Sequence, residues 1–130
     1  KNISLSGQAS YSWQHAIDIT DETEKNYRDQ IPYTPRHSGN VSVAFQMPWV
    51  NVSYLLTVVG DRYASPQNIE RNLIDRYAEQ TVSLNRTFTF GSCSLRLQFD
   101  IINIGNINYD VIKYYPMPGR SFRGGLVFVY

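Results

Sequence analysis

In the final ten residues of the chain, large apolar and aromatic side chains recur at alternate positions. One parity holds Phe122, Leu126, Phe128 and the terminal Tyr130, and the other holds Ser121, Arg123, Val127 and Val129. Because alternate side chains of a β-strand point to opposite faces, the segment predicts a strand whose apolar, aromatic face continues to the carboxylate. Soluble domains usually end in frayed, polar residues, whereas a bacterial outer-membrane barrel pins its last strand against its first. The alternating row therefore favours an outer-membrane location.

Composition limits the class of protein without identifying it. Of the 130 residues, 42% are hydrophobic and 18% are charged, which is typical of a folded chain. The net charge of +1 comes from scattered residues, so no basic patch predicts a nucleic-acid partner. No apolar run reaches the roughly 20 residues of a transmembrane helix, but a barrel strand needs only alternation. The single Cys93 excludes an internal disulfide.

Five earlier segments repeat the two-residue period. They are residues 3–14, 40–47, 50–59, 77–90 and 95–101. In the first, every odd position from Ile3 to Trp13 is apolar or glycine, and every even position is Ser or Gln. Arg86 stands on the apolar parity of the fourth segment, where a long side chain near a membrane boundary can snorkel toward water. The pattern predicts six antiparallel strands.

Short and long connections alternate between these strands. The short ones cover residues 47–50 and 91–94, and the long ones cover 18–35, 61–76 and 103–119. Outer-membrane barrels have short periplasmic turns and long extracellular loops, so the alternation places the terminal carboxylate on the periplasmic side. Aromatic girdles are then expected at both boundaries. Trp49, Phe90 and Tyr130 belong to one girdle, and Tyr63, Tyr77, Tyr114 and Tyr115 to the other.

An antiparallel β-sandwich is the main alternative fold, because its strands also alternate while their apolar faces pack inward. A sandwich, however, does not require alternating loop lengths, aromatic strand ends or an aromatic last residue. Six strands are too few for a self-contained barrel of eight, and Lys1 leads almost directly into a strand. We therefore expect the C-terminal part of a larger barrel, whose open edges would make the isolated chain self-associate.

A family resemblance appears in the segment 103–130, NIGNINYDVIKYYPMPGRSFRGGLVFVY, which is similar to the C-terminal signature of TonB-dependent outer-membrane receptors. In that signature a loop with Asn and Tyr precedes a Tyr-Pro-x-Pro-Gly-Arg block and a last strand with a terminal aromatic residue. The block is filled here by Tyr115, Pro116, Pro118, Gly119 and Arg120. Residues 31–37, IPYTPRH, also resemble the family's Pro-x-x-Pro-x-His element, which enters a descending strand.

The resemblance implies a barrel of about 22 strands with a plugged lumen, of which this chain would supply the last six. It implies energy-coupled uptake of a scarce nutrient such as an iron-siderophore, haem or cobalamin. The plug domain and the segment that contacts TonB would lie outside residues 1–130. Expected partners are outer-membrane lipid, the rest of the barrel, the plug, TonB and the barrel-assembly machinery. Porin-like and glycan-importing barrels are alternative functions.

The sequence shows no catalytic or metal-ligand constellation, so we expect neither an enzyme nor a cofactor. His15 and His37 lie on different segments without an evident partner, and Cys93 lies in a predicted tight turn. The first long loop carries five acidic residues, which could attract a cationic ligand or simply be solvated. Loop residues that could line a ligand site, or else anchor at the membrane surface, are Tyr33, Tyr63 and Tyr114.

The terminal row also predicts an assembly signal. In the family that the chain resembles, the outer-membrane assembly machinery recognises a final aromatic residue with apolar residues at alternate upstream positions. Phe122, Leu126, Phe128 and Tyr130 match that pattern. Such a strand can add to an exposed sheet edge by β-augmentation. The alternative is that these residues only face lipid in the finished barrel, and one face can serve both purposes.

Overall fold

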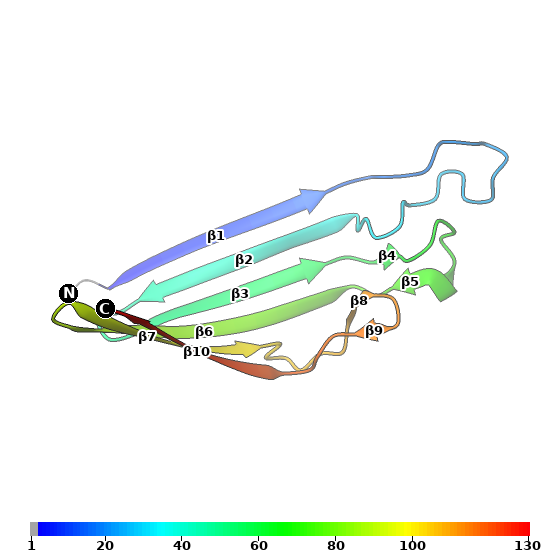
Figure 1. Ribbon diagram of the computed structural model, residues 1–130. Coiled ribbons are helices and arrows are strands. Elements are labelled where there is room, and N and C mark those ends of the chain that lie inside the picture. Colours follow the sequence, from blue (N-terminus) through cyan, green and yellow to red (C-terminus); the bar gives the residue numbers. More distant parts are fainter. Residues whose placement is uncertain (1–2) are drawn as a thin grey trace.

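One large antiparallel sheet dominates the computed structural model, which describes residues 3–130 (Figure 1). Each long strand lies beside the next long strand in the chain, so the order in the sheet is β1-β2-β3-β6-β7-β10. The strands are β1 (Ser4–Trp13), β2 (His37–Gln46), β3 (Asn51–Val59), β6 (Tyr77–Phe90), β7 (Cys93–Ile102) and β10 (Ser121–Val129). The six predicted strands are therefore confirmed.

The long connections contain short elements that the alternation did not predict. In the second, β4 (Arg62–Tyr63) pairs with β5 (Leu73–Ile74), which directly follows the 3-10 helix η1 (Glu70–Asn72). In the third, β8 (Asp110–Ile112) pairs with β9 (Tyr115–Pro116). These pieces lie beyond the end of the large sheet that is opposite the two termini (Figure 1). The long connections are thus folded structures rather than free loops.

The strand register aligns the apolar residues of all six strands into rows across one face. One complete row contains Gly7, Val43, Tyr54, Val82, Ile101 and Phe122. The neighbouring row on the other face contains Ser6, Ala44, Ser53, Ser83, Asp100 and Arg123. A slip of one residue in any strand would move its apolar set to the polar face, so the two-faced pattern fixes the register.

The apolar face is the more exposed one, the reverse of a water-soluble domain. Leu5 is 70% exposed and Phe122 is 65% exposed, whereas Asp100 on the polar face is 1% exposed. Among residues 3–130, Ile74 is the one buried hydrophobic residue, and it lies in a loop strand. No second sheet of the described residues covers the apolar face. The β-sandwich alternative is therefore wrong for this part of the chain.

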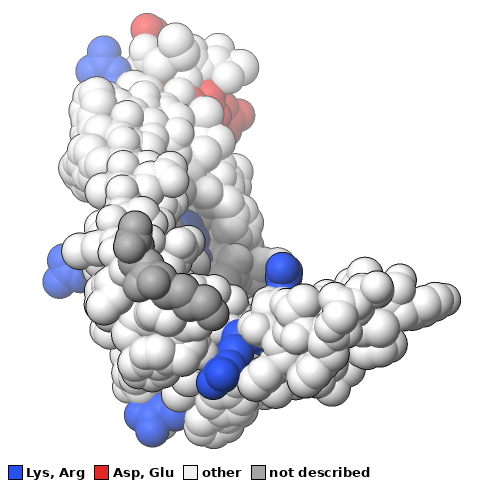
Figure 2. All heavy atoms as spheres, turned by 90° about the vertical axis from the view of Figure 1, so that its left-hand side faces the viewer, with Lys and Arg blue, Asp and Glu red and all other residues white. Residues whose placement is uncertain are grey.

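Seen from the end where the termini lie, the sheet bends into two arms that meet at an angle (Figure 2). The lower exposure of the polar row indicates that the polar face is the inner side of this bend. An antiparallel sheet that curves with polar residues inside and apolar residues outside is a segment of a barrel wall. No helix formed by residues 3–130 is long and apolar enough to cross a membrane.

Both tight turns lie at the end of the sheet that carries the termini (Figure 1). The turn at residues 47–50 agrees with prediction and is closed by a 3.0 Å bond from Met47 N–H to the Val50 carbonyl. The second turn is shorter than predicted. Cys93 is the first residue of β7 and pairs with Phe90, so its placement in the turn was wrong. Gly91 has a φ of 62°, which lets the chain reverse within two residues.

Candidate functional site

The inner face of the sheet carries a charged cluster where β7 meets β10. Arg123 Nε donates to Asp100 Oδ2 at 2.8 Å, and Gln98 Nε2 lies 3.1 Å from both carboxylate oxygens. Asp100 is 1% exposed, but the Arg123 side chain is 67% exposed. The buried carboxylate thus holds the Nε of Arg123, while most of the guanidinium stays exposed on the inner face of the sheet.

Asn103 organises the connection from β7 to β10. Its side-chain Nδ2 donates to the carbonyls of Ile107 at 2.9 Å and Pro118 at 3.2 Å, and its Oδ1 accepts from Ile107 N–H at 3.0 Å. Its own N–H donates to Glu79 Oε1 at 2.8 Å. Asn103 is 1% exposed and has a φ of 55°, a conformation that Asn tolerates better than most residues. One buried amide therefore ties both ends of the loop together.

The Gly-Arg pair of the signature block completes this loop root. The Arg120 guanidinium donates to the Ile104 carbonyl at 2.6 and 2.9 Å, and Arg120 N–H donates to Asn106 Oδ1 at 2.9 Å. A Cβ on Gly119 would lie 2.7 Å from the same Asn106 oxygen, so a side chain at this position would displace the Asn106 amide that accepts from Arg120 N–H. In this structure Gly119 and Arg120 hold the loop in place.

A cation–aromatic stack fastens the second long connection to the third. Arg62, which is 4% exposed, donates from one terminal nitrogen to the carbonyls of Asp110 at 2.7 Å and Val111 at 3.0 Å. Its guanidinium lies 5.5 Å from the centroid of the Tyr77 ring, which stacks on Tyr109 at 4.3 Å. Burial raises the pKa of the Tyr109 hydroxyl, and the nearby carboxylate of Glu79 raises it further.

The position of Tyr77 corrects one of the expected girdle residues. Tyr77 follows the polar parity of β6, because it pairs with Val59, which in turn pairs with Ser38. It therefore faces the inner side and packs under Arg62 instead of facing outward. Residues on the outer face near the same end are Tyr11 and Trp13, which are 72% and 63% exposed. The sequence already indicated this orientation, because Tyr11 and Trp13 belong to the apolar row that begins at Ile3.

The three Tyr residues that were candidates for a ligand site do not form one cluster. The Tyr33 N–H donates to the Tyr63 carbonyl at 2.8 Å, so the first two lie together where the first and second connections meet. Tyr114 lies on the tip between β8 and β9 and is 74% exposed. Tyr33 and Tyr114 have φ values of 58° and 68°. A shared role in ligand binding stays a prediction for all three.

Two of the acidic residues in the first connection form local turns. Asp18 Oδ1 accepts from Thr20 N–H at 2.9 Å, and Asp21 Oδ1 accepts from both the N–H and the hydroxyl of Thr23. Hydrogen bonds from Thr20 lower the pKa of Asp18, with a further contribution from Asn26. Those from Thr23 lower the pKa of Asp21. Each carboxylate accepts a hydrogen bond from the backbone N–H two residues further on and so stabilises a local turn, which is a structural reason for its position in the loop.

The Asp18 and Asp21 turns should open in acid. Because the folded-state pKa of each carboxyl is lowered, the turn is stabilised above the unfolded value of about 3.9 and loses that stabilisation as the pH falls through the folded value. We expect the NMR shifts of the Thr20 and Thr23 amides to move in that window. In an Asp21→Asn variant only the Thr20 amide should respond. Amide shifts that do not change down to pH 2 would contradict the prediction.

The two histidines differ in their surroundings. His37 Nδ1 lies 2.7 Å from the Tyr11 hydroxyl, and the two rings stack at 6.2 Å, so His37 has a partner that the sequence did not identify. The partner could not be seen in the sequence, because 26 residues separate the two positions. His15 lies beside Trp13, with ring centroids 6.5 Å apart. Among residues 3–130, no group of three His, Cys, Asp or Glu side chains is placed to hold a metal ion.

Three residues of the predicted assembly signal share the outer face of β10, and the fourth, Tyr130, directly follows the strand. Phe122, Leu126, Phe128 and Tyr130 are 65%, 66%, 56% and 95% exposed. Phe128 stacks on Tyr130 at 6.3 Å, and Phe122 stacks on Phe99 of β7 at 6.1 Å. β10 pairs with β7 on one side only, so its other edge is open among the described residues. The geometry suits strand addition and lipid contact alike.

Comparison with known proteins shows a similarity in fold. The curved antiparallel sheet defines the class as a β-barrel wall segment. No protein-family model matches the chain, and no curated protein matches it. Among solved structures it is similar to the ferric citrate transporter FecA in the unliganded form, with a TM-score of 0.81 and 17% sequence identity. The match covers 96% of this chain and 21% of the FecA chain, so the chain folds like about one fifth of that transporter.

Proposed function

We propose that this chain is part of the barrel wall of a TonB-dependent transporter in the bacterial outer membrane. The observation that carries the proposal is the six-stranded sheet whose outer face is apolar and exposed. Such a face is stable only against lipid or another apolar partner. The similarity in fold to a ferric citrate transporter supports transport as the activity. The last six strands of a barrel of about 22 are the assignment we favour.

The proposed cargo is a scarce nutrient such as an iron-siderophore, haem or cobalamin. Its support is the signature-like block that ends in Gly119 and Arg120, together with the likeness to a transporter of an iron chelate. The proposed partners are the remaining strands, a plug domain that meets the inner face at Arg123, TonB and the assembly machinery. The exposed outer row that ends in Tyr130 is the proposed assembly signal. A porin-like or glycan-importing barrel is the second candidate.

Cell fractionation followed by an uptake assay tests the proposal. The protein that carries these 130 residues should pellet with outer membranes, resist extraction by salt and alkali, and need detergent to dissolve. Cells that lack it should take up at least one iron-siderophore, haem or cobalamin more slowly, and collapse of the proton gradient should abolish that difference. A water-soluble monomer with a cooperative thermal transition would overturn the membrane assignment. Passive, gradient-independent uptake would favour the porin-like alternative.

A further inference from the structure

Two charged residues are buried among residues 3–130, and they differ in their partners. Asp100, which is 1% exposed, forms an ion pair with Arg123 at 2.8 Å. Arg62 is 4% exposed, but it forms no ion pair with any of the described residues. A charge taken out of water is costly unless an opposite charge or a full set of hydrogen bonds compensates it. Within the part of the chain that the structure describes, Arg62 is therefore the one buried charge without a counter-ion.

The guanidinium of Arg62 is also incompletely hydrogen-bonded. One terminal nitrogen, Nη2, donates to the carbonyls of Asp110 at 2.7 Å and Val111 at 3.0 Å. The other, Nη1, is buried and has no partner among the described residues. Most buried polar groups in folded proteins are paired, so an unpaired donor that belongs to a cation calls for a partner of opposite charge. Nη1 is the atom that such a partner would contact.

A pocket of about 210 Å³ lies between the second and third long connections. Asp110 lines it, and the Asp110 carbonyl accepts from Arg62, so the guanidinium lies directly behind the pocket wall. The Asp110 carboxylate is directed elsewhere, because its Oδ2 accepts from the Tyr114 backbone N–H at 3.1 Å. The charged residues that line the pocket are Asp75, Arg76, Asp110 and Lys113, whose charges cancel. The uncancelled charge at this site is that of Arg62.

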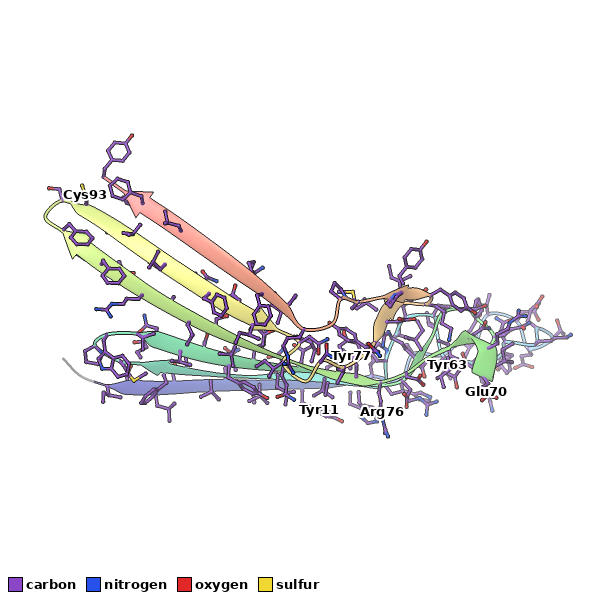
Figure 3. The ribbon with its side chains drawn as sticks, turned by 90° about the horizontal axis from the view of Figure 1, so that it is seen from below. Tyr11, Tyr63, Glu70, Arg76, Tyr77 and Cys93 are labelled. Atoms are coloured by element: carbon purple, nitrogen blue, oxygen red, sulfur yellow. The ribbon has the colours of Figure 1, made fainter. Side chains whose placement is uncertain are left out.

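The guanidinium of Arg62 lies on the inner side of the sheet. Its central carbon is 5.5 Å from the centroid of the Tyr77 ring. Figure 3 shows Tyr77 and Tyr11 on opposite sides of the ribbon, and Tyr11 belongs to the outer, apolar row. A molecule that passes through the barrel interior would therefore meet this end of the sheet on the side that carries Arg62.

We propose that Arg62 binds an oxyanion of the transported molecule, a carboxylate or a phosphate group. The anion accepts hydrogen bonds from Nη1 and neutralises the guanidinium through the charge-assisted contact that arginine makes with both groups. It enters when the third connection, which covers Arg62 with Asp110 and Val111, moves away from the second, and the third connection then closes over it. The inference rests on the proposed transport function and narrows the cargo to molecules that carry an acidic group.

Hydrogen exchange of the whole protein in neutral detergent tests the inference. The probes are succinate and inorganic phosphate, each compared with chloride at equal ionic strength. Because the anion is held only in the closed state, either probe at about ten times its dissociation constant should slow the exchange of residues 103–119 about tenfold. The cargo identified by the uptake assay should protect the same amides, and phosphate added after the cargo should give no further protection.

Three variants assign the response to Arg62. Arg62→Met removes the charge but keeps an unbranched side chain, so neither probe should change its exchange. Arg62→Lys keeps the charge without the second terminal nitrogen, so it should respond more weakly than the unchanged protein. Arg71→Met is the matched control, because Arg71 is an exposed cation of the same connection, and its response should be complete. Continued protection of the β7–β10 pairing reports that each variant is folded.

Equal exchange in chloride, succinate and phosphate would overturn the inference, since Nη1 would then be satisfied by a buried water molecule. A response that survives in Arg62→Met, or that is lost in Arg71→Met, would place the anion elsewhere and overturn the inference as well. Protection by phosphate but not by the cargo would contradict a role in uptake. A membrane-inserted protein that takes up its cargo without any anion response would refute this inference alone, whereas a water-soluble protein would refute the proposed function.

Discussion

Val43→Arg is expected to lower the free energy of unfolding in a bilayer by about 2–4 kcal/mol, the cost of an arginine on the lipid face of a barrel near the midplane. Val43 lies in the complete outer row, between Gly7 of β1 and Tyr54 of β3. Its side chain is 37% exposed, so in water the same change would alter stability by at most about 0.5 kcal/mol. The size of the destabilisation therefore distinguishes a lipid environment of the outer face from an aqueous one.

Ala44→Arg is the control for this prediction. Ala44 is the next residue of β2 but faces the polar side, between Ser6 and Ser53. An arginine there should cost little, since it projects into the barrel interior. The free energy of unfolding of both variants is measured by urea titration of the whole protein refolded into lipid vesicles. The folded fraction is read from the mobility of the unheated protein on gels. Equal and small effects of the two changes would show that the outer face does not meet lipid.

The strands could be predicted from sequence because each carries its own two-residue pattern. From Ile3 to Trp13 the alternation of apolar and polar residues holds without a break. All residues of this strand are exposed, so no packing against another layer disturbs the pattern. The alternation of short and long connections then gave the antiparallel order, because neighbouring strands joined by such connections pair with each other. The exposed apolar face was implied by the same parity, which ends at Tyr130.

The contacts among the long connections could not be predicted, because they join residues far apart in the chain. Arg62 reaches carbonyls 48 and 49 residues away, and its role depends on a pair of Tyr rings that come from different elements. Tyr77 was expected at a girdle because strand ends are rich in aromatic residues, but its parity turns it inward under Arg62. The parity of Tyr77 can be read from the sequence, so its misplacement at the girdle was avoidable. The contacts of Arg62 cannot be read from the sequence.

Asn103→Ala is expected to open the third long connection while the large sheet remains. Loss of the side chain leaves the Ile107 N–H and the carbonyls of Ile107 and Pro118 without their partner, and an unpaired buried group costs about 1–3 kcal/mol. Alanine also fits poorly at a φ of 55°, which adds about 1–2 kcal/mol. The free energy of local opening should fall by about 2–5 kcal/mol, measured by hydrogen exchange of residues 103–119.

Two further variants separate the causes of this effect. Asn103→Gly tolerates the positive φ and loses only the hydrogen bonds, so its effect should be the smaller of the two. Asn108→Ala changes an exposed residue of the same type in the same connection and should leave the exchange rates unaltered. If Asn103→Ala and Asn108→Ala behaved alike, the buried amide would not be what holds the loop. Faster exchange confined to this connection, with the β7–β10 pairing still protected, is the result expected if Asn103 fastens the loop to the barrel wall.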